Sequence, residues 1–302
     1  MLASDPDAVY RDLLIDPLRK CADYKPNLGK RDEKYDLAAF RVLYGRDPLY
    51  HWIGLDSDLM YAAHKAAGGM TSIYRQLGIG CERLVRQILR DVLRLTAEQV
   101  TWSYEVVTES TAGNTDSDEI EGELTEEPTN DVLFAVENKG AANDRRKVKP
   151  RKLSLDGRID LADVSDLEAR NRIKSWITEQ QQRLGITVPI KGAVFEVRQG
   201  YKSADSKRQN ADLANASQAI GKGYLPVLMI MSTQMNEVVK ARYEVGNWAV
   251  LMGLVGLDDP YTSTFDFCRD VIGYDLELFF VRNQHILRNE VENILKGLLT
   301  AA

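Results

Sequence analysis

Two short stretches of the sequence carry charged side chains that are suited to binding a metal ion. The run at residues 193–198 (AVFEVR) has the pattern of an apolar strand, on which Glu196 and Arg198 point to the same face. Asp160 stands at the exit of a second strand-like run, in LDGRID. Two carboxylates on neighbouring strands suit Mg²⁺, which takes one or two carboxylates and keeps several waters. We therefore predict that Asp160 and Glu196 bind Mg²⁺.

The residues around this pair suggest phosphate chemistry. A bound Mg²⁺ activates water and stabilises the charge that develops on a phosphate. Arg198 supplies a cation that helps to hold such a phosphate. Lys202, Lys207 and Arg208 follow the strand, and we predict that they contact a nucleic-acid backbone.

Charge is distributed unevenly along a chain whose net charge is −6. Residues 116–127 hold seven acids and no base, which predicts a mobile acidic loop. Residues 143–152 hold six bases and one acid. A ligand meets a local patch rather than the sum over the whole surface. The basic segment is therefore either a solvated loop or a DNA contact, and we predict the contact through Arg145, Arg146, Lys147 and Lys149.

The composition is typical of a globular protein that is not embedded in a membrane. Of the 302 residues, 44% are hydrophobic and 28% charged, and no apolar run is long enough to span a bilayer. The first residues lack the basic start and apolar core of a signal peptide. Three widely separated cysteines suggest a reducing compartment without disulfides. We expect a cytoplasmic protein.

The spacing of apolar residues predicts an α/β fold, with a mixed central sheet flanked by helices. Residues 1–95 and 233–302 are mostly helical, and residues 96–232 alternate strand and helix signals. The strand–helix–strand run at 193–231 predicts a βαβ unit. RKLSLDGRIDLADV is either one bent strand or a tight hairpin. We expect the three regions to form one compact unit.

The order of these segments resembles the PD-(D/E)xK nuclease superfamily, and type II restriction endonucleases are similar in size and style. The resemblance covers roughly residues 76–232. It rests on GIGCERL in a helix, DGRID and VFEVR in strands, QNADLANASQA in a helix and YLPVLMIM in a strand. Gln218 and Tyr224 also resemble a Gln and a Tyr of some relatives. The resemblance implies a restriction-endonuclease-like core.

Carried over residue by residue, the resemblance assigns Asp160 and Glu196 to the metal ion. It assigns an assisting role to Glu82, which is otherwise either an exposed helix residue or a partner of Arg86 four positions on. The sequence departs from the family in two ways. Arg198 stands where the family has Lys, and the 35 residues between Asp160 and Glu196 include an additional helix.

A second match to the motif lies in DVLFAVENKG, where Glu137 and Lys139 form a literal E-x-K. Its best upstream acid is Asp131, which begins the same strand, too far along it to share a metal ion with Glu137. No strong helix–strand unit follows this segment. We retain Asp160 and Glu196 as the first assignment, with Glu137 and Lys139 as the alternative catalytic pair.

The resemblance implies an Mg²⁺-dependent type II restriction endonuclease that cleaves double-stranded DNA at a short specific sequence. Two DNA strands need two sites, so we expect a homodimer. The missing Lys suggests a second hypothesis, a nuclease-fold DNA-binding protein with impaired catalysis. A third is an acidic helical scaffold whose basic segment docks a protein partner.

Overall fold

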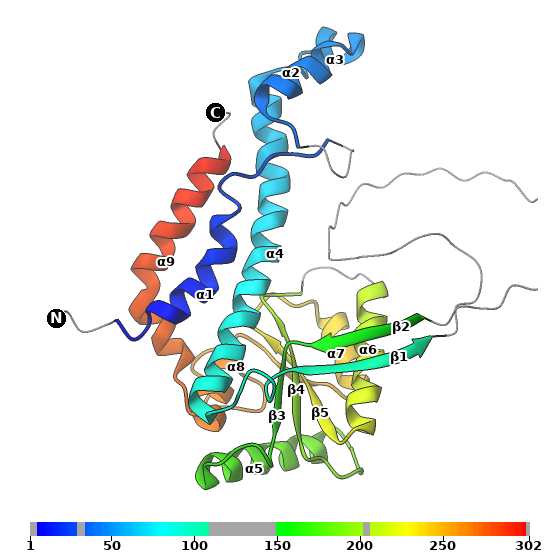
Figure 1. Cartoon of the computed structure of the whole chain (residues 1–302), viewed down its shortest axis with the longest axis vertical. Helices are drawn as coiled ribbons and strands as arrows, with labels where there is room; N and C mark the ends of the chain where they lie inside the picture. Colours follow the sequence, from blue (N-terminus) through cyan, green and yellow to red (C-terminus); the bar gives the residue numbers. More distant parts are fainter. Residues whose placement is uncertain (1–4, 29–33, 109–148, 202–205, 300–302) are drawn as a thin grey trace, which may run out of the picture. The chain divides into compact units, whose positions relative to one another are not determined.

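The computed structural model describes residues 5–28, 34–108, 149–201 and 206–299 (Figure 1). The chain divides into a large unit, formed by residues 1–102 and 155–302, and a small unit of residues 103–154. The described part of the small unit, residues 103–108 and 149–154, belongs to a two-stranded ladder between β1 (Trp102–Thr108) and β2 (Lys149–Leu155). Every residue of the candidate site described below lies in the large unit. The helices and strands that position the site are therefore those of the large unit.

A mixed four-stranded sheet forms the centre of the large unit, in the order β3-β4-β5-β6. β3 (Gly157–Asp160) runs antiparallel to β4 (Gly192–Arg198). β5 (Tyr224–Ile230) runs parallel to β4, and β6 (Ala249–Leu251) runs parallel to β5. All seven residues of β5 are buried, as in a strand covered on both faces. The predicted α/β class, with a mixed sheet flanked by helices, is confirmed at this level.

Neighbouring parallel strands must be joined by a long crossover connection, which is usually a helix. α6 (Ser206–Gly221) leads from β4 to β5, and α7 (Glu237–Val245) leads from β5 to β6. α6 packs on β5, where the small side chains of Ala216 and Ala219 are buried. The predicted strand–helix–strand unit is therefore present, and it continues into a further helix and strand.

The other face of the sheet carries the largest apolar cluster. Phe195 and Val227 point into it from the strands. α5 (Leu167–Arg183) lies between β3 and β4 in the chain and contributes Trp176, which packs on Phe267 with ring centroids 4.6 Å apart. The supporting turns are α8 (Thr264–Asp266) and the π-helical segment Phe267–Ile272.

One long helix, α4 (Asp58–Leu93), connects the sheet to the N-terminal helices. Ser57 caps it by accepting a hydrogen bond from the backbone N–H of Met60. Its C-terminal half buries a row of apolar side chains in the sheet cluster, while Gly80 faces α1 (Ala8–Arg19). A Cβ atom at Gly80 would lie 2.4 Å from the carbonyl oxygen of Leu14, so glycine lets the two backbones touch.

Helices from distant parts of the chain pack beside α4 (Figure 1). α9 (Leu276–Leu299) and α1 both contact α4 and contact each other. Asp7, just before α1, accepts hydrogen bonds from the side chains of Arg282 and Asn283 in α9. Of the helices in the described ranges, none has the length and apolar character needed to cross a bilayer. The remaining helices are α2 (Leu37–Gly45) and α3 (Pro48–Trp52), next to the start of α4.

Candidate functional site

Glu196 and Arg198 lie on the face of β4 that is opposite the large apolar cluster. Their neighbours Phe195 and Val197 belong to that cluster, so strand alternation turns Glu196 and Arg198 the other way. Nη2 of Arg198 forms an ion pair with Oε1 of Glu196, and their side chains are only 16% and 9% exposed. The predicted orientation of this pair is confirmed, and the charges are almost fully removed from solvent.

The carboxylate brought next to Glu196 is that of Asp156, not Asp160. Asp156 lies at the bend between β2 and β3. Its backbone N–H donates to the carbonyl oxygen of Phe195 at 2.8 Å. Its Oδ2 accepts from the backbone N–H of Val197, also at 2.8 Å. These two bonds hold the Asp156 carboxyl beside the backbone on either side of Glu196.

Asp160 lies at the other end of the paired strands. In the antiparallel register Gly157 is opposite Phe195, and Asp160 is opposite Gly192. Four residues of β4 therefore separate the partner of Asp160 from Glu196, about 13 Å along the strand. The structure does not bring Asp160 and Glu196 together as predicted, because moving forward along β3 means moving back along β4.

Asp160 has a different set of partners. Its Oδ2 accepts a hydrogen bond from the hydroxyl of Tyr224 at 2.7 Å, and its Oδ1 accepts from the backbone N–H of Ala162 at 3.0 Å. Tyr224 packs edge-on against Trp102, with ring centroids 4.7 Å apart. Burial, followed by the hydrogen bond to Asp160, raises the pKa of Tyr224 to about 12. The contacts of Asp160 thus join β3 to the start of β5.

Glu82 lies beside the acidic pair, on α4. Nη2 of Arg86 donates to Oε1 of Glu82 at 2.7 Å, so the predicted pairing four residues apart is confirmed. Nε of Arg86 donates to the carbonyl oxygen of Asp156 at 2.8 Å. Arg86 therefore connects Glu82 to the strand bend, and Glu82 is near enough to perturb the carboxyl groups of Asp156 and Glu196.

Two further residues of this site were not predicted from the sequence. Asp212 of α6 places Oδ2 3.5 Å from Nη2 of Arg198. The hydroxyl of Tyr243 in α7 donates to the same oxygen at 2.5 Å and lies 3.1 Å from the hydroxyl of Tyr201. The sequence holds one usable signal, because Asp212 is the only charged residue between 209 and 221. A single acid on an alanine-rich helix facing a sheet needs a partner.

Burial and mutual repulsion shift the pKa values of this cluster. Burial first, then the charge of Glu82, raises the pKa of Asp156 to about 6. Burial raises the pKa of Glu196 well above its ordinary value, against the opposing effect of Arg198. Burial by itself lowers the pKa of Arg198. The neighbouring carboxylates, Glu196 foremost, raise this pKa by a larger amount, so the net shift is upward. Burial and the neighbouring carboxylates therefore favour the protonated forms of Asp156 and Glu196.

The donor set fits a hard divalent cation. Asp156 and Glu196 offer carboxylate oxygens, the ligands that Mg²⁺ prefers. Within the described ranges, no three His, Cys, Asp or Glu side chains are grouped to ligate one ion. An ion at this site would be held by Asp156 and Glu196 and would keep water in its other positions, as Mg²⁺ usually does in proteins.

We expect Asp156→Asn to stabilise the metal-free protein. The folded state binds the Asp156 proton more tightly than the unfolded chain, since its pKa is raised from about 4 to about 6. The free energy of unfolding of the wild type should therefore fall as pH rises through this range. The amide oxygen of the substituted side chain would still accept the hydrogen bond from Val197. The Asp156→Asn variant should therefore gain on the order of 1–2 kcal/mol in free energy of unfolding at neutral pH.

Urea denaturation in EDTA at several pH values measures this effect. The matched control is Asp160→Asn, which removes a carboxylate with good hydrogen bonds and should not stabilise the protein. A loss of stability in Asp156→Asn at pH 7 would contradict the raised pKa of Asp156.

For the remaining predicted residues, the structure describes the backbone alone or does not describe the residue. Lys207 and Arg208 lie in the first turn of α6, the next helix in the chain after β4. Lys149 is the first residue of β2. Their side chains are not described. The other predicted residues lie outside the described residues: Lys202, Arg145, Arg146, Lys147, Glu137 and Lys139.

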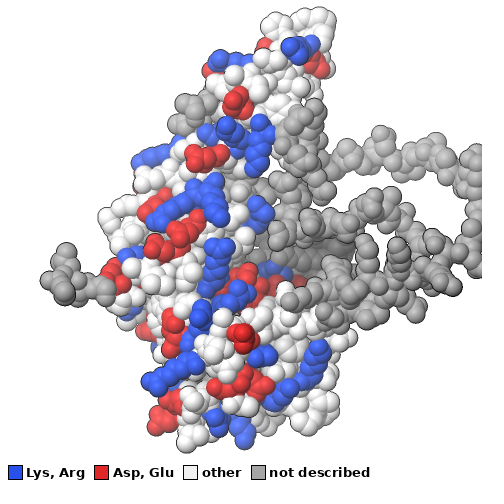
Figure 2. Space-filling model, in the orientation of Figure 1, with Lys and Arg blue, Asp and Glu red and all other residues white. Residues whose placement is uncertain are grey.

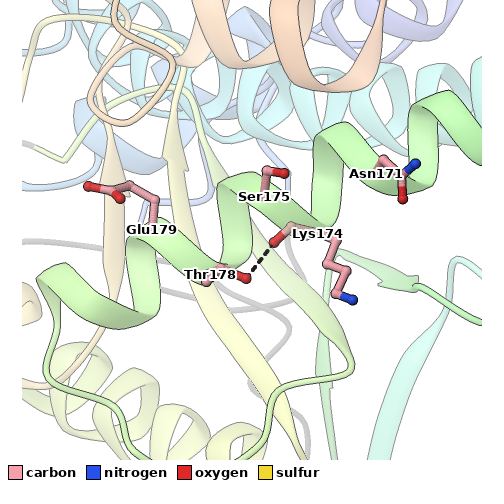
Figure 3. A pocket seen from close by; sticks show the side chains of 5 residues that line it. All are labelled: Asn171, Lys174, Ser175, Thr178 and Glu179. Carbon is pink, nitrogen blue, oxygen red and sulfur yellow. Dashed lines mark hydrogen bonds between the residues drawn. The ribbon is translucent and has the colours of Figure 1, made fainter.

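A second feature of the surface is an open depression on α5 (Figure 3). Its five lining side chains, Asn171, Lys174, Ser175, Thr178 and Glu179, all come from this one helix. The hydroxyl of Thr178 donates to the carbonyl oxygen of Lys174 at 2.9 Å. This is the pattern of a solvated helix face, and we assign it no function.

Comparison with models of protein families, with curated proteins and with solved structures found no match.

Proposed function

We propose that this protein is an Mg²⁺-dependent nuclease that hydrolyses phosphodiester bonds in double-stranded DNA. The observation that carries the proposal is the grouping of Asp156, Glu196 and Arg198 where β3 meets β4. An acid at the bend and an E-x-R on the antiparallel neighbour match the motif order of PD-(D/E)xK nucleases, with Asp156 in place of Asp160. The proposed fold is accordingly a restriction-endonuclease-like core.

Each residue has a distinct role in the proposed reaction. Asp156 and Glu196 would hold the ion, which supplies water activation and charge stabilisation when bound. Arg198 would bind the scissile phosphate and stabilise the charge that develops on it. Arginine remains protonated at every working pH, so Arg198 cannot act as a titrating base. Glu82 would adjust the charge of the site through its position beside Asp156.

A face of α4 supports DNA as the substrate. Arg83, Arg86 and Arg90 are spaced three and four residues apart, so they lie on one side of the helix, next to Glu82. Arg83 is exposed, and Arg86 and Arg90 are half-buried. In Figure 2, Lys and Arg side chains, interspersed with Asp and Glu side chains, form a broken band along the course that α4 takes in Figure 1. Such a band is suited to a phosphate backbone.

We expect Arg83→Ala to weaken binding to specific and random DNA alike. If Arg83 contacts one phosphate, the slope of log affinity against log salt should become shallower by about one unit. Fluorescence anisotropy over a salt series measures it. Arg288→Ala on α9 removes the same charge from another exposed position and should leave the slope unchanged. Equal slopes for the two variants would remove α4 from the DNA interface.

Plasmid cleavage tests the proposed activity directly. The wild type should nick or cut plasmid in Mg²⁺ and not in EDTA, and Glu196→Gln should be inactive under both conditions. Discrete bands from phage DNA would establish the sequence specificity of a type II enzyme. Because two strands need two sites, we also propose a homodimer. Sedimentation on a duplex carrying the site would show two chains per duplex.

The ion pair between Glu196 and Arg198 favours a second candidate, a DNA-binding protein of the same fold with impaired catalysis. In that case the guanidinium would occupy the carboxylate that an ion needs. A specific gel shift in Ca²⁺, without cleavage in Mg²⁺ or Mn²⁺, would support this candidate. Absence of both would contradict the two DNA-related proposals.

A further inference from the structure

Arg198 is shared between two buried carboxylates. Its Nη2 forms the ion pair with Glu196 and also lies 3.5 Å from Oδ2 of Asp212. The Nε atom of Arg198 is buried and has no hydrogen-bond partner among the described residues. Nη2 of Arg198 thus lies between two acids that face it from different elements, β4 and α6.

Asp212 is held in place by Tyr243 of α7, the helix of the next crossover. Tyr243 is fully buried and donates its hydroxyl to Oδ2 of Asp212. The ring of Tyr243 packs edge-on against Tyr201 and Trp248, with centroids 5.6 and 5.8 Å away. The carboxylate of Asp212 therefore has a defined position whether or not Arg198 contacts it.

The ion of the proposed function and the guanidinium of Arg198 would compete for the carboxylate of Glu196, whose Oε1 already contacts Nη2 of Arg198. Two cations at such short range repel strongly in a buried site. Arg198 has to leave Glu196 when an ion binds, yet a buried charge without a partner is costly. Asp212 removes this conflict, because it offers a second acceptor without moving the guanidinium into solvent.

We propose that Asp212, held by Tyr243, is a positioning residue that draws Arg198 away from Glu196 when a divalent ion binds. This inference rests on the proposed function, since it concerns the ion at Asp156 and Glu196. In the ion-free protein Arg198 neutralises Glu196. In the ion-bound protein Arg198 pairs with Asp212 and stays beside the site, ready for the phosphate.

Calorimetric titration of the full chain with Mg²⁺, without DNA, tests the inference by a readout other than activity. Asp212→Asn should weaken Mg²⁺ binding about tenfold, within the usual range for coupled neighbouring sites. Arg198→Gln should strengthen it, because Glu196 is freed. In the Arg198→Gln background, Asp212→Asn should have little further effect. Asp212→Glu keeps a carboxylate and should retain most of the affinity.

The outcomes separate the two proposals. A wild type that binds no divalent ion overturns the proposed function, and this inference with it. Ion binding that Asp212→Asn leaves unchanged overturns this inference alone. So does an equal loss in both backgrounds, because Asp212 would then act on the ion directly. If Asp212→Asn does not fold, Arg198→Gln still decides, since unchanged or weaker ion binding in that variant contradicts the competition.

Discussion

Asp156→Asn will abolish DNA cleavage, whereas Asp160→Asn will leave it largely intact. The two residues lie four positions apart, but only Asp156 is hydrogen-bonded beside Glu196, through Val197. Loss of one carboxylate from a two-carboxylate site should remove the ion and its charge stabilisation, a loss of at least a hundredfold to a thousandfold in rate. DNA affinity should stay within about tenfold, because phosphate contacts dominate it.

Plasmid cleavage at saturating Mg²⁺ with both variants measures this difference. Loss of activity in Asp160→Asn with normal cutting by Asp156→Asn would return the metal site to the end of β3. Glu196→Gln should be inactive as well. If it cuts normally and Glu137→Gln does not, the site belongs to the pair Glu137 and Lys139, outside the described residues.

Arg198→Ala will lower the rate of cleavage by about a hundredfold or more, comparable to removing one transition-state donor. Arg198→Lys will keep measurable cleavage, with an altered metal preference, because Lys delivers charge without the planar fork. Arg198→Ala also frees Glu196 of its ion pair, so the loss should appear in kcat while Mg²⁺ binding improves. Single-turnover cleavage over a series of Mg²⁺ concentrations separates the two effects.

The cation nearest in sequence provides the control for this prediction. Lys202 follows Arg198 by four residues, and a long side chain can reach back. Normal cutting by Arg198→Ala together with loss in Lys202→Ala would transfer the role to Lys202. If neither variant changes the rate, the E-x-R of β4 is a structural ion pair and the nuclease proposal loses its support.

The two central strands of the sheet, β4 and β5, were predictable because each has a strong local pattern. The continuous apolar run of β5 and the alternation in β4 are both patterns within a few consecutive residues, so they can be recognised without knowing the tertiary contacts. Gly185, with a φ of +66°, follows the C-terminal end of α5, where glycine adopts the left-handed conformation without strain. β6 was missed within a region predicted to be mostly helical, because three residues are too few to show a strand period.

The site was only half predictable, for a reason of register. Asp156 and Asp160 are an even number of residues apart, so strand alternation gives both the same parity and cannot choose between them. The choice depends on where the chain bends and on which residue of β4 faces Gly157. The contact of Asp212 with Arg198 and Tyr243 is harder still, because it depends on how α6 and α7 pack on the sheet.

The packing of α1 against α9 sets an order for folding during synthesis. Arg11 of α1 donates to the side chain of Asn283 in α9, a separation of 272 residues. At about 5–20 residues per second, a ribosome needs roughly 15–55 s to make the second partner after the first. α4 emerges much sooner, and Gly80 lets it contact α1 closely. We expect α1 and α4 to pair first, leaving the surface for α9 exposed to chaperones until residues 276–299 emerge.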